Sequence, residues 1–121
     1  MTTLKREFGD WGEGIAKEYF LKKGYRFLAG NFSYKKYEID LIFEDEKKKT
    51  IIFIEVKTRK SDSIGLPEES ITHTKQEKIR KCAVLYIKLN PEYNRHAVRF
   101  DSFTVIRNEN DFRTNHIEYA F

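Results

Sequence analysis

The sequence predicts a single α/β domain, spanning residues 1–121, in which a mixed β-sheet is flanked by α-helices. Two apolar runs rich in β-branched and aromatic residues, 38–43 and 51–57, surround the charged segment 44–50 and so predict a β-hairpin. Apolar residues at helical spacing before and after this hairpin predict two helices. Strand-like runs follow each helix, and this order favours helices packed on one mixed sheet.

The first helix is expected over residues 5–23, followed by Gly24 as a helix stop. Its apolar stripe has the spacing of three, four and four residues that one helix face requires: Phe8, Trp11, Ile15 and Tyr19. A first strand is expected over residues 25–29, ended by Gly30 and Asn31. Residues 32–37 are expected to form an aromatic and basic connector that leads into the hairpin.

The second helix is predicted after a polar loop over residues 58–65. Pro67 suits the first turn of a helix, which is expected to continue to about Leu89 with a bend near His73. Its core face is a stripe at helical spacing: Ile79, Cys82, Ala83, Tyr86 and Leu89. The single cysteine of the chain lies in this stripe, so it is predicted to be a buried structural thiol.

Two further strands are expected in the last quarter of the chain, over residues 96–106 and 117–121. The segment between them, 108–115, is polar and predicts a turn region. No apolar run reaches membrane-spanning length and the first residues lack the apolar region of a signal peptide, so the cytoplasm is the expected location, with no membrane partner.

The basic excess of the chain is concentrated in one region. The formal net charge is +4, and residues 57–95 carry 9 basic against 5 acidic side chains. Residues 1–56 are close to balance, with 11 against 10, as are residues 96–121, with 3 against 4. A polyanion would be drawn to the basic region, although a solvated lysine-rich helix face accounts for it equally well.

The predicted hairpin brings two acidic residues together. If it folds about a midpoint between Lys47 and Lys48, Asp40 faces Glu55 with Cβ atoms about 5 Å apart. Glu38 then faces Lys57, on the same side as Glu55. Two carboxylates among apolar strands are unfavourable unless a cation lies between them, and oxygen ligands without His or Cys favour Mg²⁺ over Zn²⁺. An exposed salt-bridge ladder on a solvated face is an equally weighted alternative.

A third carboxylate, Glu13, lies on the shoulder of the first helix. It can pair with Lys17 one helical turn later. It can also lean over the gap between Asp40 and Glu55 and add a third acid to the same site. Both interpretations stay open at this level.

The arrangement of these acids resembles the restriction-endonuclease-like nuclease superfamily, whose signature is an acidic residue, a spacer, then Glu or Asp, any residue, and Lys. Further residues in the same order are similar to the small YraN-like bacterial family, assigned as endonucleases that resemble Holliday-junction resolvases: Gly12-Glu13, Ala16, Gly24-Tyr25, Asn31, 38–42, 53–59, Gly65, Lys75 and 99–101. The likeness covers nearly the whole chain. The Pro that often precedes the first Asp is Ile39 here, a departure that leaves the chemistry intact.

This resemblance implies a restriction-endonuclease-like fold and a metal-dependent endonuclease that hydrolyses phosphodiester bonds, with DNA favoured and branched or structured DNA included. Asp40, Glu55 and Lys57 would be the catalytic residues. Asp40 and Glu55 would ligate the metal, joined by Glu13 directly or through water. Lys57 would position the attacking water and offset charge in the transition state. The implied cofactor is Mg²⁺, for which Mn²⁺ can substitute.

The resemblance also implies which basic residues meet the nucleic acid. Arg59 and Lys60 emerge beside the site, and Lys75 on the following helix would contact phosphate. Arg99 and Asp101 match the family as well, but their spacing on one strand favours a structural ion pair. A homodimer is compatible with the resemblance, because resolvase-like relatives are often dimers.

Two other functions remain open at this level. The basic region and the aromatic, basic connector 32–37 would also suit a non-catalytic nucleic-acid-binding module. Such a module would bind in a salt-sensitive way that neither metal nor loss of Glu55 changes. A protein-interaction role would follow if the chain had no affinity for nucleic acid at low salt.

Overall fold

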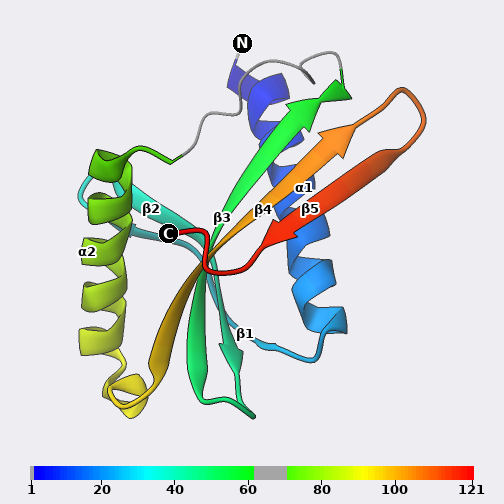
Figure 1. Cartoon of the computed structure of the whole chain (residues 1–121). Helices are drawn as coiled ribbons and strands as arrows, with labels where there is room; N and C mark the ends of the chain where they lie inside the picture. The colour runs from blue at the N-terminus through cyan, green and yellow to red at the C-terminus, as the bar shows by residue number, and fades with distance from the viewer. Residues whose placement is uncertain (1, 62–70) are drawn as a thin grey trace.

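The computed structural model describes residues 2–61 and 71–121 and shows an α/β fold (Figure 1). The elements in chain order are α1 (Thr2–Lys22), β1 (Arg26–Tyr34), β2 (Tyr37–Asp45), β3 (Thr50–Lys60), α2 (His73–Leu89), the short 3-10 helix η2 (Pro91–Tyr93), β4 (Ala97–Arg107) and β5 (Phe112–Ile117). Within this part of the chain, neither helix combines the length and apolar character needed to cross a membrane.

The five strands form one mixed sheet in the order β1-β2-β3-β4-β5. All neighbours are antiparallel except β3 and β4, which are parallel. Parallel neighbours need a crossover connection, and α2 lies within the segment that joins β3 to β4. The helices α1 and α2 lie on opposite sides of the twisted sheet (Figure 1). The expected mixed sheet flanked by helices is confirmed.

The sheet separates two apolar layers, and β3 contributes to both by strict alternation. Ile52 and Ile54 pack in the layer under α1, whereas Ile51 and Phe53 pack in the layer under α2. The strand is buried as far as Ile54 and only partly buried from the next residue, Glu55, onwards. The half of β3 that carries the candidate site residues therefore begins where the core ends.

Three boundaries differ from the sequence prediction in the first half of the chain. Strand β1 continues through Gly30 and Asn31, and only residues 35–36 are left of the expected connector. Asn31 adopts a positive φ of 51°, a conformation that Asn tolerates, so the strand is not ended there. The expected loop over 58–65 starts late, because residues 58–60 still pair with β4 as part of β3.

The second helix begins later than expected. Thr72 caps α2, because its hydroxyl oxygen accepts a hydrogen bond from Lys75 N at 3.2 Å. Residues 71–72 are not helical, so the described helix is not a continuation bent near His73. The expected opening at Pro67 lies outside the described residues. Cys82 is fully buried on the core face of the helix, as predicted.

The last strand was misplaced by the sequence prediction. The polar segment forms most of β5, whose pairing with β4 runs from Arg107–Phe112 to Ser102–Ile117. Five of its six residues are exposed, so it lacks the apolar alternation from which strands are predicted. The chain beyond β5 is held by Ala120, whose N–H donates to the Phe100 carbonyl at 2.7 Å.

The ion pair expected between Arg99 and Asp101 is present and buried. Arg99 Nε and Nη2 donate to the two carboxylate oxygens of Asp101, each at 2.9 Å. His116 Nε2 lies 2.7 Å from Asp101 Oδ2, and its Nδ1 is 3.1 Å from the Tyr19 hydroxyl. A further ion pair joins Arg99 to Glu118 at 2.8 Å. This network ties α1, β4 and β5 together, which is a structural role.

Candidate functional site

The β2–β3 hairpin has the predicted register. Its pairs run from Asp45–Thr50 at the turn to Leu41–Ile54. The ladder ends there, one pair before the expected Asp40–Glu55 pair. The two strands separate at this point, and Val56 N donates to Asp40 Oδ2 at 2.7 Å. The Asp40 carboxylate thus lies between the strands. Asp40 contacts the backbone of Val56 and does not form the expected cross-strand pair with Glu55.

The side-chain alternation of β2 also breaks at this position. Ile39 and Ile42 both pack in the layer under α2, although they are three residues apart. Leu41 packs in the layer under α1. Strict alternation would place Ile39 with Leu41, so the strand changes its facing beside Asp40. This break leaves the Asp40 carboxylate within electrostatic reach of acids from both faces of the sheet.

The surroundings of Asp40 disfavour its charge. The pKa of Asp40 is raised to about 7, chiefly by burial and then by the carboxylates of Glu13, Glu55 and Glu38, against the lowering effect of the Val56 N–H. Asp40 therefore lies among acids contributed by α1, β2 and β3. Burial and neighbouring acids therefore dominate the electrostatic surroundings of Asp40.

Glu13 lies close enough to Asp40 to raise its pKa. Burial raises the pKa of Glu13 itself, and Glu38 adds to this effect by repulsion. The Asn31 amide, oriented with its nitrogen toward the acids, donates to Glu13 Oε1 at 3.1 Å and to Glu38 Oε1 at 2.7 Å. Lys17, the alternative partner of Glu13, has its Nζ 4.0 Å from the centre of the Phe27 ring.

Asn31 therefore lies at the candidate site with Glu38 beside it, although the sequence analysis named it only as part of the family resemblance and as a strand end. Glu38 was expected to face Lys57, but it shares the Asn31 amide with Glu13 instead. The sequence signal for Asn31 was the Gly30-Asn31 pair, which was interpreted as a strand end. An Asn with positive φ inside a strand reorients the chain locally and supplies an amide to the acids.

Gly12 sets how closely α1 lies against β3. A Cβ atom added there would be 2.2 Å from Thr58 Oγ1, so a larger residue would push the helix away from the strand. Because Glu13 is the next residue, this close approach also fixes where its carboxylate lies. The glycine at this position therefore allows the close approach of α1 to the sheet.

Glu55 holds one paired and one unpaired carboxylate oxygen. Its side chain is 11% exposed, and its Oε1 forms an ion pair with Lys75 Nζ from α2. Its Oε2 is buried and finds no hydrogen-bond partner among the described residues. Buried carboxylate oxygens are almost always satisfied, so this atom is an acceptor open to a water or a cation.

The expected basic residues lie around the mouth of this site, with one exception. A pocket of about 840 Å³ opens above Glu55, and its charged lining residues are Lys5, Glu55, Lys57, Arg59 and Lys75. Lys57 follows Glu55 on the same side of β3, as alternation predicts. Lys60 is exposed at the end of β3 and is not among the residues that line the pocket.

The donor set suits a hard cation, although it is not a complete cage. Among the described residues, no three His, Cys, Asp or Glu side chains are arranged so that they could hold a metal by themselves. Mg²⁺ does not need such a cage, since it keeps several waters and binds through one or two carboxylates plus phosphate oxygens. Asp40 and the orphaned Glu55 Oε2 meet that smaller requirement.

The fold and the site define an α/β protein with a mixed sheet between two helices and an acidic centre where β2 and β3 part. The chain belongs to the family described as "Uncharacterised protein family UPF0102", which it matches over residues 12–105. That segment contains all the acidic and basic site residues described above except Lys5.

Curated relatives match almost end to end. A UPF0102 protein of Syntrophomonas wolfei is 40% identical over 118 residues, which cover 98% of this chain and 100% of the relative. A UPF0102 protein of Thermodesulfovibrio yellowstonii is 45% identical over 116 residues, with 95% and 96% covered. One from Caldanaerobacter subterraneus is 42% identical over 120 residues, with 97% and 96% covered.

Proposed function

We propose that this chain is a metal-dependent endonuclease, an Mg²⁺-dependent phosphodiesterase that acts on nucleic acid, with DNA as the favoured substrate. One observation carries the proposal: the buried, unpartnered Glu55 Oε2 lies at the gap where Asp40 is surrounded by further acids. A divalent cation would satisfy both groups. The basic residues that line the pocket above Glu55 would bind the phosphate backbone.

The resemblance to the restriction-endonuclease-like superfamily and to the YraN-like family supports the same function. Asp40 precedes the separation of the two strands, and Glu55 and Lys57 follow it on one side of β3. A mixed sheet between two helices is compatible with that superfamily's architecture. This pattern of one acid, then acid, any residue and lysine is the one the resemblance assigns to catalysis.

Asp40 and Glu55 would hold the ion, and Glu13 would contribute through water, since its carboxylate is engaged by the Asn31 amide. Bound Mg²⁺ would supply Lewis-acid chemistry and a water of lowered pKa. The Val56 N–H fixes one oxygen of Asp40 and so orients its carboxylate.

The cationic side chains would act on the substrate rather than on the ion. Lys57 would position the attacking water and offset the negative charge that develops on the phosphate. Arg59 lines the pocket, and Lys60 extends beyond it along the strand, so both would bind flanking phosphates. Lys75 would exchange its ion pair with Glu55 for a phosphate contact when the substrate enters.

A second candidate is a nucleic-acid-binding module without catalysis. The ion pair of Lys75 with Glu55 favours it, because an internal ammonium group already neutralises part of the acidic charge. In that case the basic residues around the pocket would bind phosphate while Lys75 remained paired with Glu55 and kept a cation from the acids. Metal would then change neither affinity nor stability.

The test is cleavage of flapped, branched, single-stranded and duplex DNA, and of RNA, with Mg²⁺, Mn²⁺ or EDTA. Wild type is compared with Asp40→Asn, Glu55→Gln and Lys57→Ala. We expect metal-dependent cleavage that each substitution lowers by about 10² to 10³-fold, because each removes a group that stabilises charge in the transition state.

Glu46→Gln is the matched control, because it removes an exposed carboxylate at the opposite end of the same hairpin. It should cleave like wild type. Activity that persists in all three site variants would assign the cleavage to a contaminant or to another site. Salt-sensitive binding that metal and Glu55→Gln leave unchanged, without cleavage, would establish the non-catalytic candidate.

A further inference from the structure

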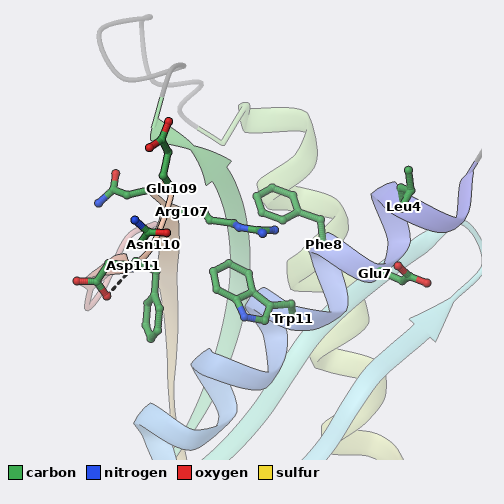
Figure 2. A pocket seen from close by; sticks show the side chains of 10 residues that line it. Leu4, Glu7, Phe8, Trp11, Arg107, Glu109, Asn110 and Asp111 are labelled. Carbon is green, nitrogen blue, oxygen red and sulfur yellow. Dashed lines mark hydrogen bonds between the residues drawn. The ribbon is translucent and has the colours of Figure 1, made fainter.

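A second pocket adjoins the acidic site. It has a volume of about 480 Å³ and lies between the first turns of α1 and the turn that joins β4 to β5 (Figure 2). Phe8 lines both this pocket and the one above Glu55, so the two pockets are neighbours at the start of α1. The residues that line it fall outside the segment 12–105 that matches the family.

The wall of this pocket is a flat aromatic surface with a guanidinium group beside it. Phe8 and Trp11 stack with their ring centroids 5.8 Å apart and an interplanar angle of 10°. Arg107 reaches from β4 toward both rings (Figure 2), with Cζ 5.9 Å and 5.6 Å from their centroids. Phe112 closes the surface edge-on, 5.6 Å from Trp11.

The aromatic surface remains open to solvent. Phe112 is 43% exposed, Arg107 is exposed, and Phe8 and Trp11 are only partly buried. A cluster that served only to fasten the hairpin to the helix would be expected to bury its rings more completely. The surface thus has unused stacking area next to the proposed catalytic pocket.

Polar side chains line the pocket on both sides of the rings, with the carboxylates of Glu7, Glu109 and Asp111 pointing away from the aromatic surface (Figure 2). The rim carries carboxylates and amides from both elements: Glu7, Asn108, Glu109, Asn110 and Asp111. Carboxylates accept hydrogen bonds from the amino groups of bases, and amides both donate and accept. The same carboxylates repel phosphate. The chemistry of this pocket therefore suits a planar, uncharged ring rather than the nucleic-acid backbone.

We propose that this pocket binds an unpaired nucleobase, stacked on Phe8 and Trp11 beside the Arg107 guanidinium. The inference rests on the proposed function and narrows its substrate class: a strand whose phosphate lies above Glu55 extends one base into the aromatic pocket. A base can do so only when it is unstacked from its partner strand. The favoured substrates are therefore single strands, flaps and branch points, and not continuous duplex.

Trp11 is the only tryptophan of the chain, so its intrinsic fluorescence reports on stacking in this pocket. The full-length Asp40→Asn protein is titrated in EDTA, where cleavage does not occur, with a fluorescein-labelled single strand and with a blunt duplex of the same sequence. Label anisotropy measures binding. With unlabelled oligonucleotides, tryptophan emission measures stacking, and we expect quenching by the single strand but not by the duplex.

Variants then assign the quenching to this pocket. Arg107→Ala and Phe112→Ala, each made in the Asp40→Asn background, should weaken binding of the single strand by about 5- to 100-fold, the range of one lost base stack. Neither should change duplex binding. Arg113→Ala is the matched control, because it removes an exposed arginine from the same hairpin. Circular dichroism and thermal melting check that each variant is folded.

The outcomes separate this inference from the proposed function. Binding by anisotropy without tryptophan quenching, or equal quenching by duplex and single strand, would overturn the base pocket, and metal-dependent cleavage would be unaffected by that result. Selective quenching in a protein that never cleaves would support the pocket and refute the nuclease. An absence of any binding would overturn both.

Discussion

Two aspartates of the sheet, Asp101 on β4 and Asp40 on β2, have opposite surroundings. Asp101 is fully buried, and although burial raises its pKa, hydrogen bonds from His116 and Arg99 outweigh that effect and hold the pKa below its usual range. Asp40 receives a single hydrogen bond, from the Val56 N–H. Burial and neighbouring acids raise its pKa to about 7.

The difference separates a structural carboxylate from the one that we propose to be functional. Asp101 has its counter-charge built into the chain, so it stabilises the fold without any ligand. Burial and neighbouring acids instead disfavour the charge of Asp40, and among the described residues its neighbour Glu55 has a buried oxygen without a hydrogen-bond partner. A protein tolerates this arrangement where a cation from outside completes the site. The contrast therefore supports the proposed metal site.

The largest effect should come from removing Asp101. Asp101→Asn leaves Arg99 buried without a full counter-charge, which should lower the free energy of unfolding by about 3–5 kcal/mol. Asp40→Asn keeps an oxygen for the Val56 N–H and removes repulsion, so metal-free stability should stay equal or rise. Urea unfolding at pH 7 in EDTA measures both. Equal losses in the two variants would erase the distinction between the aspartates.

The pH dependence of stability should also differ between the two carboxylates. Between the unfolded-state pKa near 4 and about 7, the folded chain binds more protons at Asp40 than the unfolded chain does. The free energy of unfolding therefore falls as pH rises through this window, by about 4 kcal/mol at most. Asp101 acts oppositely, because its lowered pKa stabilises the fold above pH 4 and this contribution is lost on acidification.

Urea unfolding in EDTA at pH 4.5 and pH 7.5 isolates the Asp40 contribution. The difference between the two pH values should be smaller in Asp40→Asn than in wild type, because the variant cannot ionise at this position. Glu46→Gln, in which an exposed carboxylate is removed, should behave like wild type. An unchanged pH difference in Asp40→Asn would place the pKa of Asp40 near its ordinary value.

Metal should supply a counter-charge to Asp40. A ligand at 100 times its dissociation constant stabilises the folded state by about 2.7 kcal/mol. Mn²⁺ or Mg²⁺ should raise the melting temperature of wild type accordingly, and EDTA should reverse the rise. Asp40→Asn and Glu55→Gln should lose most of this stabilisation, whereas Glu46→Gln should keep it. Equal stabilisation of all four proteins would indicate a site elsewhere.

The register of the β2–β3 hairpin could be predicted from the sequence, because two β-branched runs about a short charged turn allow few pairings. The same alternation placed Glu55 and Lys57 on one side of β3. The early end of the ladder at Leu41–Ile54 could not be predicted, since the separation of two strands depends on tertiary packing. The hydrogen bond from Val56 to Asp40 is a consequence of that separation.

Two other features of the site could not be predicted from the sequence. Asn31 follows a glycine and has positive φ, two signals that ordinarily mark a strand end, yet β1 continues through it. The orphaned Glu55 oxygen and the pairing of Glu55 with Lys75 depend on where α2 begins. In the described part of the chain that start is set by the Thr72 cap, whereas the expected opening at Pro67 lies outside the described residues.

The smallest effect should come from removing Lys75. Its ion pair with Glu55 is exposed to solvent, whereas the ion pair of Arg99 with Asp101 is buried. Lys75 is 56% exposed, so its ion pair is screened by solvent, and Lys75→Ala should change stability by no more than about 1 kcal/mol. The substitution should also release Glu55 Oε1 to the ion. Mn²⁺ affinity, measured by calorimetry, should rise by up to about 5-fold.

Lys81→Ala, which removes another exposed lysine of α2, should leave Mn²⁺ affinity unchanged. A weaker affinity in Lys75→Ala would mean that Lys75 holds Glu55 in position for the ion and does not compete with it. The Lys75 ammonium group would then be a fixed part of the site. The Lys75–Glu55 pair would differ from the Arg99–Asp101 pair only in being more exposed to solvent, and it would not open when a cation binds. A higher affinity requires that Lys75 leaves Glu55 when a cation enters, which is how an acidic site stays folded before its ion arrives.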